Sequence, residues 1–178
     1  AAIGDGFHTT RLIALGAGAW RVEDRGALQT LRFDRATFRA VDFARSQGVI
    51  GQRHFQGSLY VALDEAHPAP VVALREAAVA DVPAAAPHPY LVEGRWRVGG
   101  LVADRDGIRF SAQGYGRGAM TWWVPLPGRY RIEASRGGEA LEAAEAVAGA
   151  DHILGIELGQ IAGTPIEVTV RLAAPAGP

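Results

Sequence analysis

The sequence contains no cysteine, no lysine and no asparagine among its 178 residues. The absence of cysteine excludes disulfide bonds, thiol nucleophiles, cysteine-ligated zinc and iron–sulfur clusters. The absence of asparagine excludes acceptor sites for N-glycosylation. All 18 basic residues are arginines, and they stand against 19 acidic residues, so the formal charge is −1. The composition is otherwise rich in alanine, glycine, proline and arginine, which is typical of GC-rich coding sequence.

Long apolar runs and long basic runs are also missing. No apolar run approaches the roughly 20 residues of a membrane-spanning helix, and no signal peptide is recognisable. The near-zero net charge argues against nucleic-acid binding, because contacts to phosphate dominate that affinity. We therefore expect neither a membrane span nor a nucleic-acid partner. The chain opens at Ala1 without methionine, so we interpret it as a mature product or an excised piece.

Glycine and proline punctuate the whole chain, with 23 and 10 residues respectively. They separate short apolar stretches, a spacing typical of β-sandwiches and barrels rather than of helical proteins. Several stretches alternate strictly, as in Ile166, Val168 and Val170, which share one strand face. We predict an all-β fold, a jelly-roll-like antiparallel β-sandwich of about 10–12 strands. Residues 139–148 have helix-forming composition, and we predict either a helix or a loop with a brief strand there.

Residues 76–89 interrupt the pattern with three prolines and many alanines, and we interpret them as a linker or a long crossover loop. Either two small β-modules or two halves of one sandwich meet there. We prefer one domain, since each half alone would be a small β unit. The predicted parts are a sandwich at 9–174 with halves 9–75 and 90–173, and a disordered tail at 175–178.

The segment 49–63 is predicted to form a hairpin, and strand alternation decides which of its side chains face outward. A loop of odd length puts Phe55 on the core side and turns Gln52 and His54 outward beside Tyr60. A two-residue turn reverses this and buries Gln52 and His54. Because burial of polar groups without partners is costly, we favour the odd loop. The resulting outer patch suits hydroxyl-rich ligands, although an ordinary solvated sheet face has the same composition.

Two further segments carry aromatic candidates. In the strand predicted at 119–124, Trp122 lies on the apolar face and Trp123 on the other, so we expect Trp123 to be exposed or covered by a loop. An exposed indole can stack on a sugar ring or pack in a protein interface. Residues 114–118 are predicted to be a glycine-rich loop that presents Tyr115 and Arg117 to a glycan or an acidic group. A plain connection with Arg117 in solvent is the alternative.

The chemistry-bearing side chains show no pattern typical of a catalytic or metal site. The five histidines lack the spacing of a zinc triad, and no His-Glu-x-x-His occurs. No Gly-x-Ser-x-Gly segment of the serine-hydrolase type is present. Asp104-x-Asp106-Gly107 lacks the later acidic ligands of a calcium loop, so we predict a turn there. We predict no catalytic residue, no metal site and no cofactor for this segment.

Two segments carry a family resemblance: 41–51 with the following 57–63, and 87–93. Together they resemble the region after the deacetylase domain in bacterial exopolysaccharide hydrolase/deacetylases of the Pel polysaccharide pathway type. The resemblance implies an accessory β-sandwich beside an enzyme, in the periplasm or outside the cell. It also implies that residues 1–8 are the tail of a preceding catalytic barrel. It carries over no catalytic residue, because the Asp-Asp pair and the His-x-x-x-His motif typical of such deacetylases do not occur here.

Residues and resemblance together predict a non-catalytic module that binds or positions an amino-sugar polysaccharide for an attached glycoside hydrolase or deacetylase. The alternative is a structural or docking module that packs on a neighbouring domain or an export scaffold without binding glycan. An independent enzyme requires carboxylates or histidines to converge in the folded chain. The predicted ligand-binding residues are Trp123, Tyr60, Tyr115, Arg117, His54 and Gln52.

Overall fold

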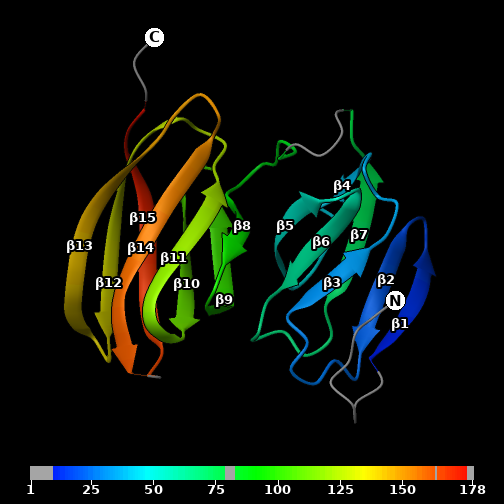
Figure 1. The fold of residues 1–178 in the computed structure, drawn as a ribbon, viewed down its shortest axis with the longest axis horizontal. Coiled ribbons are helices and arrows are strands. Elements are labelled where there is room, and N and C mark those ends of the chain that lie inside the picture. The colour runs from blue at the N-terminus through cyan, green and yellow to red at the C-terminus, as the bar shows by residue number, and fades with distance from the viewer. Residues whose placement is uncertain (1–9, 79–82, 163, 176–178) are drawn as a thin grey trace. The chain divides into compact units, whose positions relative to one another are not determined.

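The computed structural model describes residues 10–78, 83–162 and 164–175 (Figure 1). In these ranges the fold is all-β, with fifteen strands and no helix, as predicted in class. The recorded strand pairs within each unit are antiparallel. The strands exceed the predicted 10–12, partly because residues 139–148 form a full strand. No helix in the described ranges is long and apolar enough to cross a membrane.

The chain divides into two compact units, Ala1–Ala84 and Ala85–Pro178, here called unit 1 and unit 2. Their boundary falls inside the predicted linker 76–89. The preference for a single sandwich built from both halves stays a prediction. The predicted barrel tail at 1–8 lies outside the described residues. Of the predicted tail at 175–178, Pro175 belongs to the last strand and the rest lies outside the described residues.

Unit 1 places its strands in two sheets. One has the order β1–β2–β7–β4, and the other pairs β6 with both β5 and β3. Apolar side chains from both sheets form one core, in which Val22, Leu59 and Val72 are fully buried. The strands are β1 (Arg11–Gly16), β2 (Ala19–Glu23), β3 (Thr30–Phe33), β4 (Arg39–Val41), β5 (Val49–Phe55), β6 (Ser58–Leu63) and β7 (Val71–Glu76).

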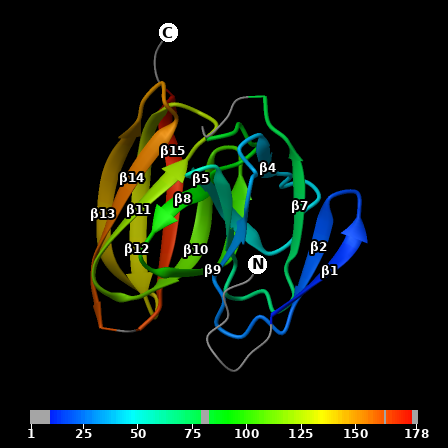
Figure 2. The ribbon, with the colours of Figure 1, turned by 45° about the vertical axis from the view of Figure 1, so that its right-hand side comes forward.

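Unit 2 is also built from two layers, an arrangement consistent with a β-sandwich. One sheet has the order β13–β12–β15–β10–β9, and β11 pairs with both β14 and β8 in the other (Figure 2). The rings of Phe110 and Trp122 meet between the layers at 4.9 Å. The jelly-roll connection stays a prediction. The strands are β8 (Tyr90–Gly94), β9 (Arg97–Asp104), β10 (Gly107–Gln113), β11 (Tyr115–Trp123), β12 (Gly128–Arg136), β13 (Glu139–Ala148), β14 (Ile153–Ala162) and β15 (Ile166–Pro175).

Strand β13 shows tertiary pairing overriding local propensity. Its alanine- and glutamate-rich sequence favours helix, yet it pairs with β12 from Glu139 opposite Arg136 to Ala148 opposite Gly128. Its small side chains lie beside large apolar ones, as where Ala146 pairs with Tyr130. The expectation of a helix or of a brief strand in a loop is therefore wrong. The turn predicted at 104–107 does connect β9 and β10, and the Asp104 carboxylate accepts a hydrogen bond from the Asp106 amide at 2.9 Å.

Candidate functional site

The β5–β6 hairpin closes with a two-residue turn, not with the predicted odd loop. Gln56 and Gly57 have φ values of 50° and 73°, the left-handed geometry that a type I′ turn requires. The register follows from this turn, and Phe55 pairs directly with Ser58. The right-handed twist of the flanking strands favours this turn type, which explains why the hairpin adopts it.

The shorter turn reverses the predicted faces of β5. Gln52 is buried, with 4% of its surface exposed, and Phe55 is exposed rather than in the core. Gln52 pairs with Val61, whereas Tyr60 belongs to the opposite face of the sheet. The prediction that Gln52 and His54 share an outer patch with Tyr60 is therefore wrong. It rested on the assumption that these polar side chains would find no partners when turned inward.

Both polar side chains do find partners, on the short strand β4. The side-chain carbonyl of Gln52 accepts a hydrogen bond from the Val41 amide at 2.7 Å. The imidazole Nε2 of His54 donates to the carbonyl of Arg39, also at 2.7 Å. The other edge of β4 pairs with β7, so the two side chains complete the hydrogen bonding of this strand. They act in the fold and fix the backbone of Arg39.

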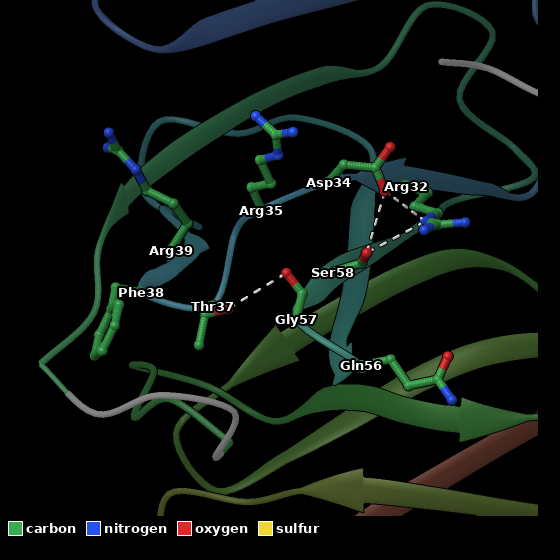
Figure 3. Close-up of a pocket in the computed structure, with 9 residues that line it drawn as sticks. All are labelled: Arg32, Asp34, Arg35, Thr37, Phe38, Arg39, Gln56, Gly57 and Ser58. Atoms are coloured by element: carbon green, nitrogen blue, oxygen red, sulfur yellow. Dashed lines mark hydrogen bonds and ion pairs between the residues drawn. The ribbon is translucent and has the colours of Figure 1, made fainter.

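Beside this hairpin turn lies an open pocket of about 670 Å³, contained within unit 1 (Figure 3). It is built by the end of β3, the connection 34–38, the start of β4 and the turn itself. The lining residues are Arg32, Asp34, Arg35, Thr37, Phe38, Arg39, Gln56, Gly57 and Ser58.

The connection 34–38 is held against the hairpin turn by several hydrogen bonds. The carbonyl of Gly57 accepts from the Ala36 amide at 3.0 Å and from the Thr37 hydroxyl at 3.4 Å. The Asp34 carboxylate accepts from the Ser58 hydroxyl at 3.2 Å. These contacts give one wall of the pocket a defined backbone.

The three arginines of the pocket differ in their partners. Arg32 forms an ion pair with Asp34 at 2.8 Å, and these two charges compensate one another. The guanidinium groups of Arg35 and Arg39 have no ion pair or hydrogen bond within the described ranges, and both are exposed. Figure 3 shows both extending to the same side of the pocket. The pocket therefore carries two guanidinium groups without an ion pair of their own, and Glu76 is the cross-strand neighbour of Arg39 on β7. The 60%-exposed ring of Phe38 lines the same pocket and points away from both groups (Figure 3).

Tyr60 adjoins the pocket through a row of side chains across three strands. It pairs with Arg32 on β3 and with Arg53 on β5, so all three share the outer sheet face. The guanidinium carbon of Arg32 lies 5.9 Å from the centre of the Tyr60 ring, within cation–π range. Of the six predicted binding residues, Tyr60 and His54 contact residues that line the pocket, Tyr60 through Arg32 and His54 through the backbone of Arg39, and neither lines it itself.

Trp123 is buried, with 5% of its surface exposed, so of the two predicted alternatives, exposed or covered by a loop, exposure is wrong. Its indole lies nearly parallel to the ring of Tyr90 at 5.3 Å and to the ring of His152 at 5.5 Å. Two adjacent tryptophans on one strand are thus both buried, because Trp122 enters the core between the sheets and Trp123 is covered on the other face. A covered ring offers no stacking surface to a sugar.

The segment 114–118 is mostly strand rather than the predicted loop. Tyr115 and Arg117 lie at the start of β11 and are 83% and 84% exposed, the latter for its side chain. Arg117 forms an ion pair with Glu157 at 3.3 Å. Both belong to unit 2, whereas the arginine pocket belongs to unit 1. Their role as ligand contacts stays a prediction.

Of the three glycines of this segment, Gly114 and Gly118 serve packing, whereas Gly116 has a left-handed φ of 74°. A side-chain carbon at Gly114 or Gly118 would clash with the indole of Trp96, which lies against the bare backbone of both. Trp96 is buried, at the turn between β8 and β9. Gly114 and Gly118 therefore form a seat for an aromatic ring.

The pocket residues Arg35, Phe38 and Arg39 were missed by the sequence reasoning. A signal existed, since residues 32–39 contain three arginines and two phenylalanines between two short strands. Only the folded chain shows that Asp34 forms an ion pair with one of these arginines and leaves the other two without an ion pair.

The arrangement suits binding rather than bond cleavage. Asp34 is the single carboxylate among the nine lining residues, whereas glycoside hydrolysis needs a pair across a cleft. Ser58 lies against Asp34 and Arg32 with no histidine among the lining residues. Within the described ranges no three acidic or histidine side chains gather to hold a metal ion. Comparisons with family models, curated proteins and solved structures found no match to this chain.

Unit 1 has a second hollow, of about 510 Å³, and one of its lining residues, Arg25, has a structural role. Arg25 is buried, and its guanidinium donates to the carbonyls of Asp64 and His67 at 2.8 and 2.9 Å. Burial lowers the pKa of Arg25, against the opposing effect of Asp64 and Glu65. Its charge is thus committed to the turn at 64–67, and we assign the binding site to the first pocket.

Proposed function

We propose that this chain is a non-catalytic module that binds a polysaccharide through the arginine pocket of unit 1. The observation that carries the proposal is the combination of two uncompensated guanidinium groups with an exposed aromatic ring in an open hollow. Arginine supplies a planar fork of donors for sugar hydroxyl or carboxyl oxygens. The rings of Phe38 and Tyr60 supply apolar faces for the C–H side of a pyranose.

An attached hydrolase or deacetylase, and a periplasmic or extracellular location, are part of the same proposal. They rest on the resemblance of segments 41–51 and 87–93 to exopolysaccharide hydrolase/deacetylases. In that setting the module keeps its polymer near a catalytic domain by raising the local concentration of substrate.

Affinity electrophoresis of the 178-residue chain in gels containing single polysaccharides tests the proposal. We expect at least one polysaccharide to retard the chain, and Phe38→Ala with Arg39→Gln to abolish the retardation. Arg109→Gln is the matched control, since Arg109 is exposed on β10 of unit 2, outside the pocket. Absence of retardation by neutral, acidic and cationic polymers alike would overturn the proposal.

The second candidate function is docking on a partner domain, and strand β1 favours it. This strand lies at the edge of its sheet, and Leu12 and Leu15 expose 39% and 48% of their surfaces. Edge strands with exposed apolar residues are suited to pairing with another chain. If docking is the function, Leu15→Arg abolishes capture of the partner domain. The polysaccharide gels then retard neither the wild-type chain nor the Leu15→Arg variant.

A further inference from the structure

We infer that the arginine pocket selects a polysaccharide bearing carboxylate groups, a polyuronate, rather than a neutral or amino-sugar polymer. The inference rests on the proposed function and narrows it to one class of ligand. It departs from the amino-sugar polymer that the sequence prediction names, because a deacetylated amino sugar is cationic and the pocket is cationic too.

The local charge excess is the first step of the argument. Residues 1–84 contain nine arginines and nine acidic residues, so unit 1 is formally neutral as a whole. Within the pocket, however, one carboxylate faces three guanidinium groups, and it is already paired with Arg32. A ligand carboxylate would meet Arg35 and Arg39 without having to displace a carboxylate of the chain itself.

The backbone of Arg35 is the second step. Its φ of 54° lies in the left-handed region, which costs a non-glycine residue about 1–2 kcal/mol. Glycine or asparagine would occupy this turn position more easily, yet an arginine stands there with its side chain exposed at the pocket. Backbone strain at a ligand-facing residue is a feature of binding sites.

The anchoring of Arg39 is the third step. Its amide donates to the carbonyl of Ala36 at 3.0 Å, and its carbonyl accepts from His54 at 2.7 Å. The backbone is therefore held on both sides while the guanidinium group stays unpaired within the described ranges. This arrangement limits the entropy lost when the side chain binds an anion.

A carboxylate fits these groups, because a guanidinium fork binds it, as it binds a phosphate, through two parallel hydrogen bonds. The sugar ring to which a uronate carboxylate is attached would find Phe38 and, across Arg32, Tyr60. A free phosphate would use the same guanidinium groups but would gain nothing from the two aromatic rings.

Isothermal titration of the 178-residue chain separates these possibilities. The probes are trigalacturonate, trimannuronate, the methyl ester of trigalacturonate, a chitosan trimer and inorganic phosphate. We expect at least one free uronate to bind tenfold or more tightly than the ester, because charge-assisted hydrogen bonds contribute about 1.5–3 kcal/mol each. We expect its affinity to fall as NaCl is raised.

Variants then locate the site. Arg35→Gln and Arg39→Gln should each lower uronate affinity about tenfold by the same reasoning, and Arg109→Gln should leave it unchanged. Arg35→Gly is the sharpest variant. It relieves the left-handed strain, so we expect an unchanged or higher melting temperature together with weaker uronate binding.

The failure modes are distinct. If the methyl ester or the chitosan trimer binds as tightly as both uronates, the carboxylate inference is wrong and the proposed function stands. If phosphate binds as tightly as the uronates, the aromatic rings contribute nothing and the inference is wrong. If no sugar probe binds and no polysaccharide retards the chain, the inference and the proposed function both fall.

Discussion

The side-chain carbonyl of Gln52 accepts a hydrogen bond from the Val41 backbone amide at 2.7 Å, in the interior of unit 1. Gln52 thereby supplies a hydrogen-bond acceptor to the backbone of β4, as a neighbouring strand would. In the described ranges its Nε2 has no hydrogen-bond partner, so the acceptor is the atom that matters. The polar side chain is buried because it completes a strand edge, and the same strand carries Arg39 into the pocket.

Gln52→Ala should therefore destabilise the fold locally and globally. The Val41 amide would lose its acceptor in a buried place, at a cost of about 1–3 kcal/mol. Hydrogen exchange at Val41 should accelerate, and chemical denaturation should show the lower free energy of unfolding. Gln29→Ala, at an exposed position, is the control and should change neither. An unchanged exchange rate at Val41 would show that the bond contributes nothing.

Trp123→Ala should be strongly destabilising, by about 3–5 kcal/mol, because it empties a buried site between two aromatic rings. Thermal denaturation followed by circular dichroism measures the loss. Tyr115→Ala removes an exposed ring from the same strand and should change stability by less than about 0.5 kcal/mol. Equal melting temperatures for the two variants would contradict the burial of Trp123.

Gly118→Ala should displace the indole of Trp96, since the added methyl group would occupy the space of the ring. Overpacking of this kind costs about 1–3 kcal/mol, and the emission of the displaced tryptophan should shift to longer wavelength. Gly155→Ala is a matched control on the paired strand β14, where a side-chain carbon would meet nothing within 4 Å. If both variants keep the wild-type spectrum and stability, Trp96 does not rest on Gly118.

Tyr130 should make stability depend on alkaline pH. Burial raises the pKa of its phenol to about 12, with a further contribution from Asp106. The phenol also donates to the Leu126 carbonyl at 2.6 Å, a bond that only the protonated form makes. Between pH 10 and 12 the unfolded chain loses this proton while the folded chain keeps it, so stability falls as pH rises through this window.

Denaturation at several pH values checks this prediction, together with an absorbance titration of the phenolates. In Tyr130→Phe the step near pH 12 should vanish, and the loss of stability between pH 10 and 12 should become shallower. A wild-type titration complete by pH 11 would contradict the raised pKa.

The fold class was predictable because it depends on local features. Glycine and proline spacing, together with alternation such as that of Ile166, Val168 and Val170, specifies strands whatever their neighbours are. The turn at 104–107 was predictable for the same reason. Pairing partners, by contrast, turned a helix-favouring sequence into β13, because its ladder with β12 runs along the whole segment.

The candidate site was less accessible from sequence, because burial depends on partners distant in the chain. Trp123 is covered by Tyr90 and His152, which lie 33 and 29 positions away. Gln52 and His54 are turned inward because β4 offers them a backbone edge. Strand alternation alone could not choose between the two faces of the hairpin, since that choice depends on one residue of turn length.

By itself, the sequence determined that this chain is built of strands, that it has no thiol chemistry and that its cations are all arginines. Only the tertiary structure decided which arginines are uncompensated. Asp34 is adjacent to Arg35 in the chain but forms its ion pair with Arg32, at 2.8 Å. Charge pairing is a matter of distance in space, and the fold sets that distance.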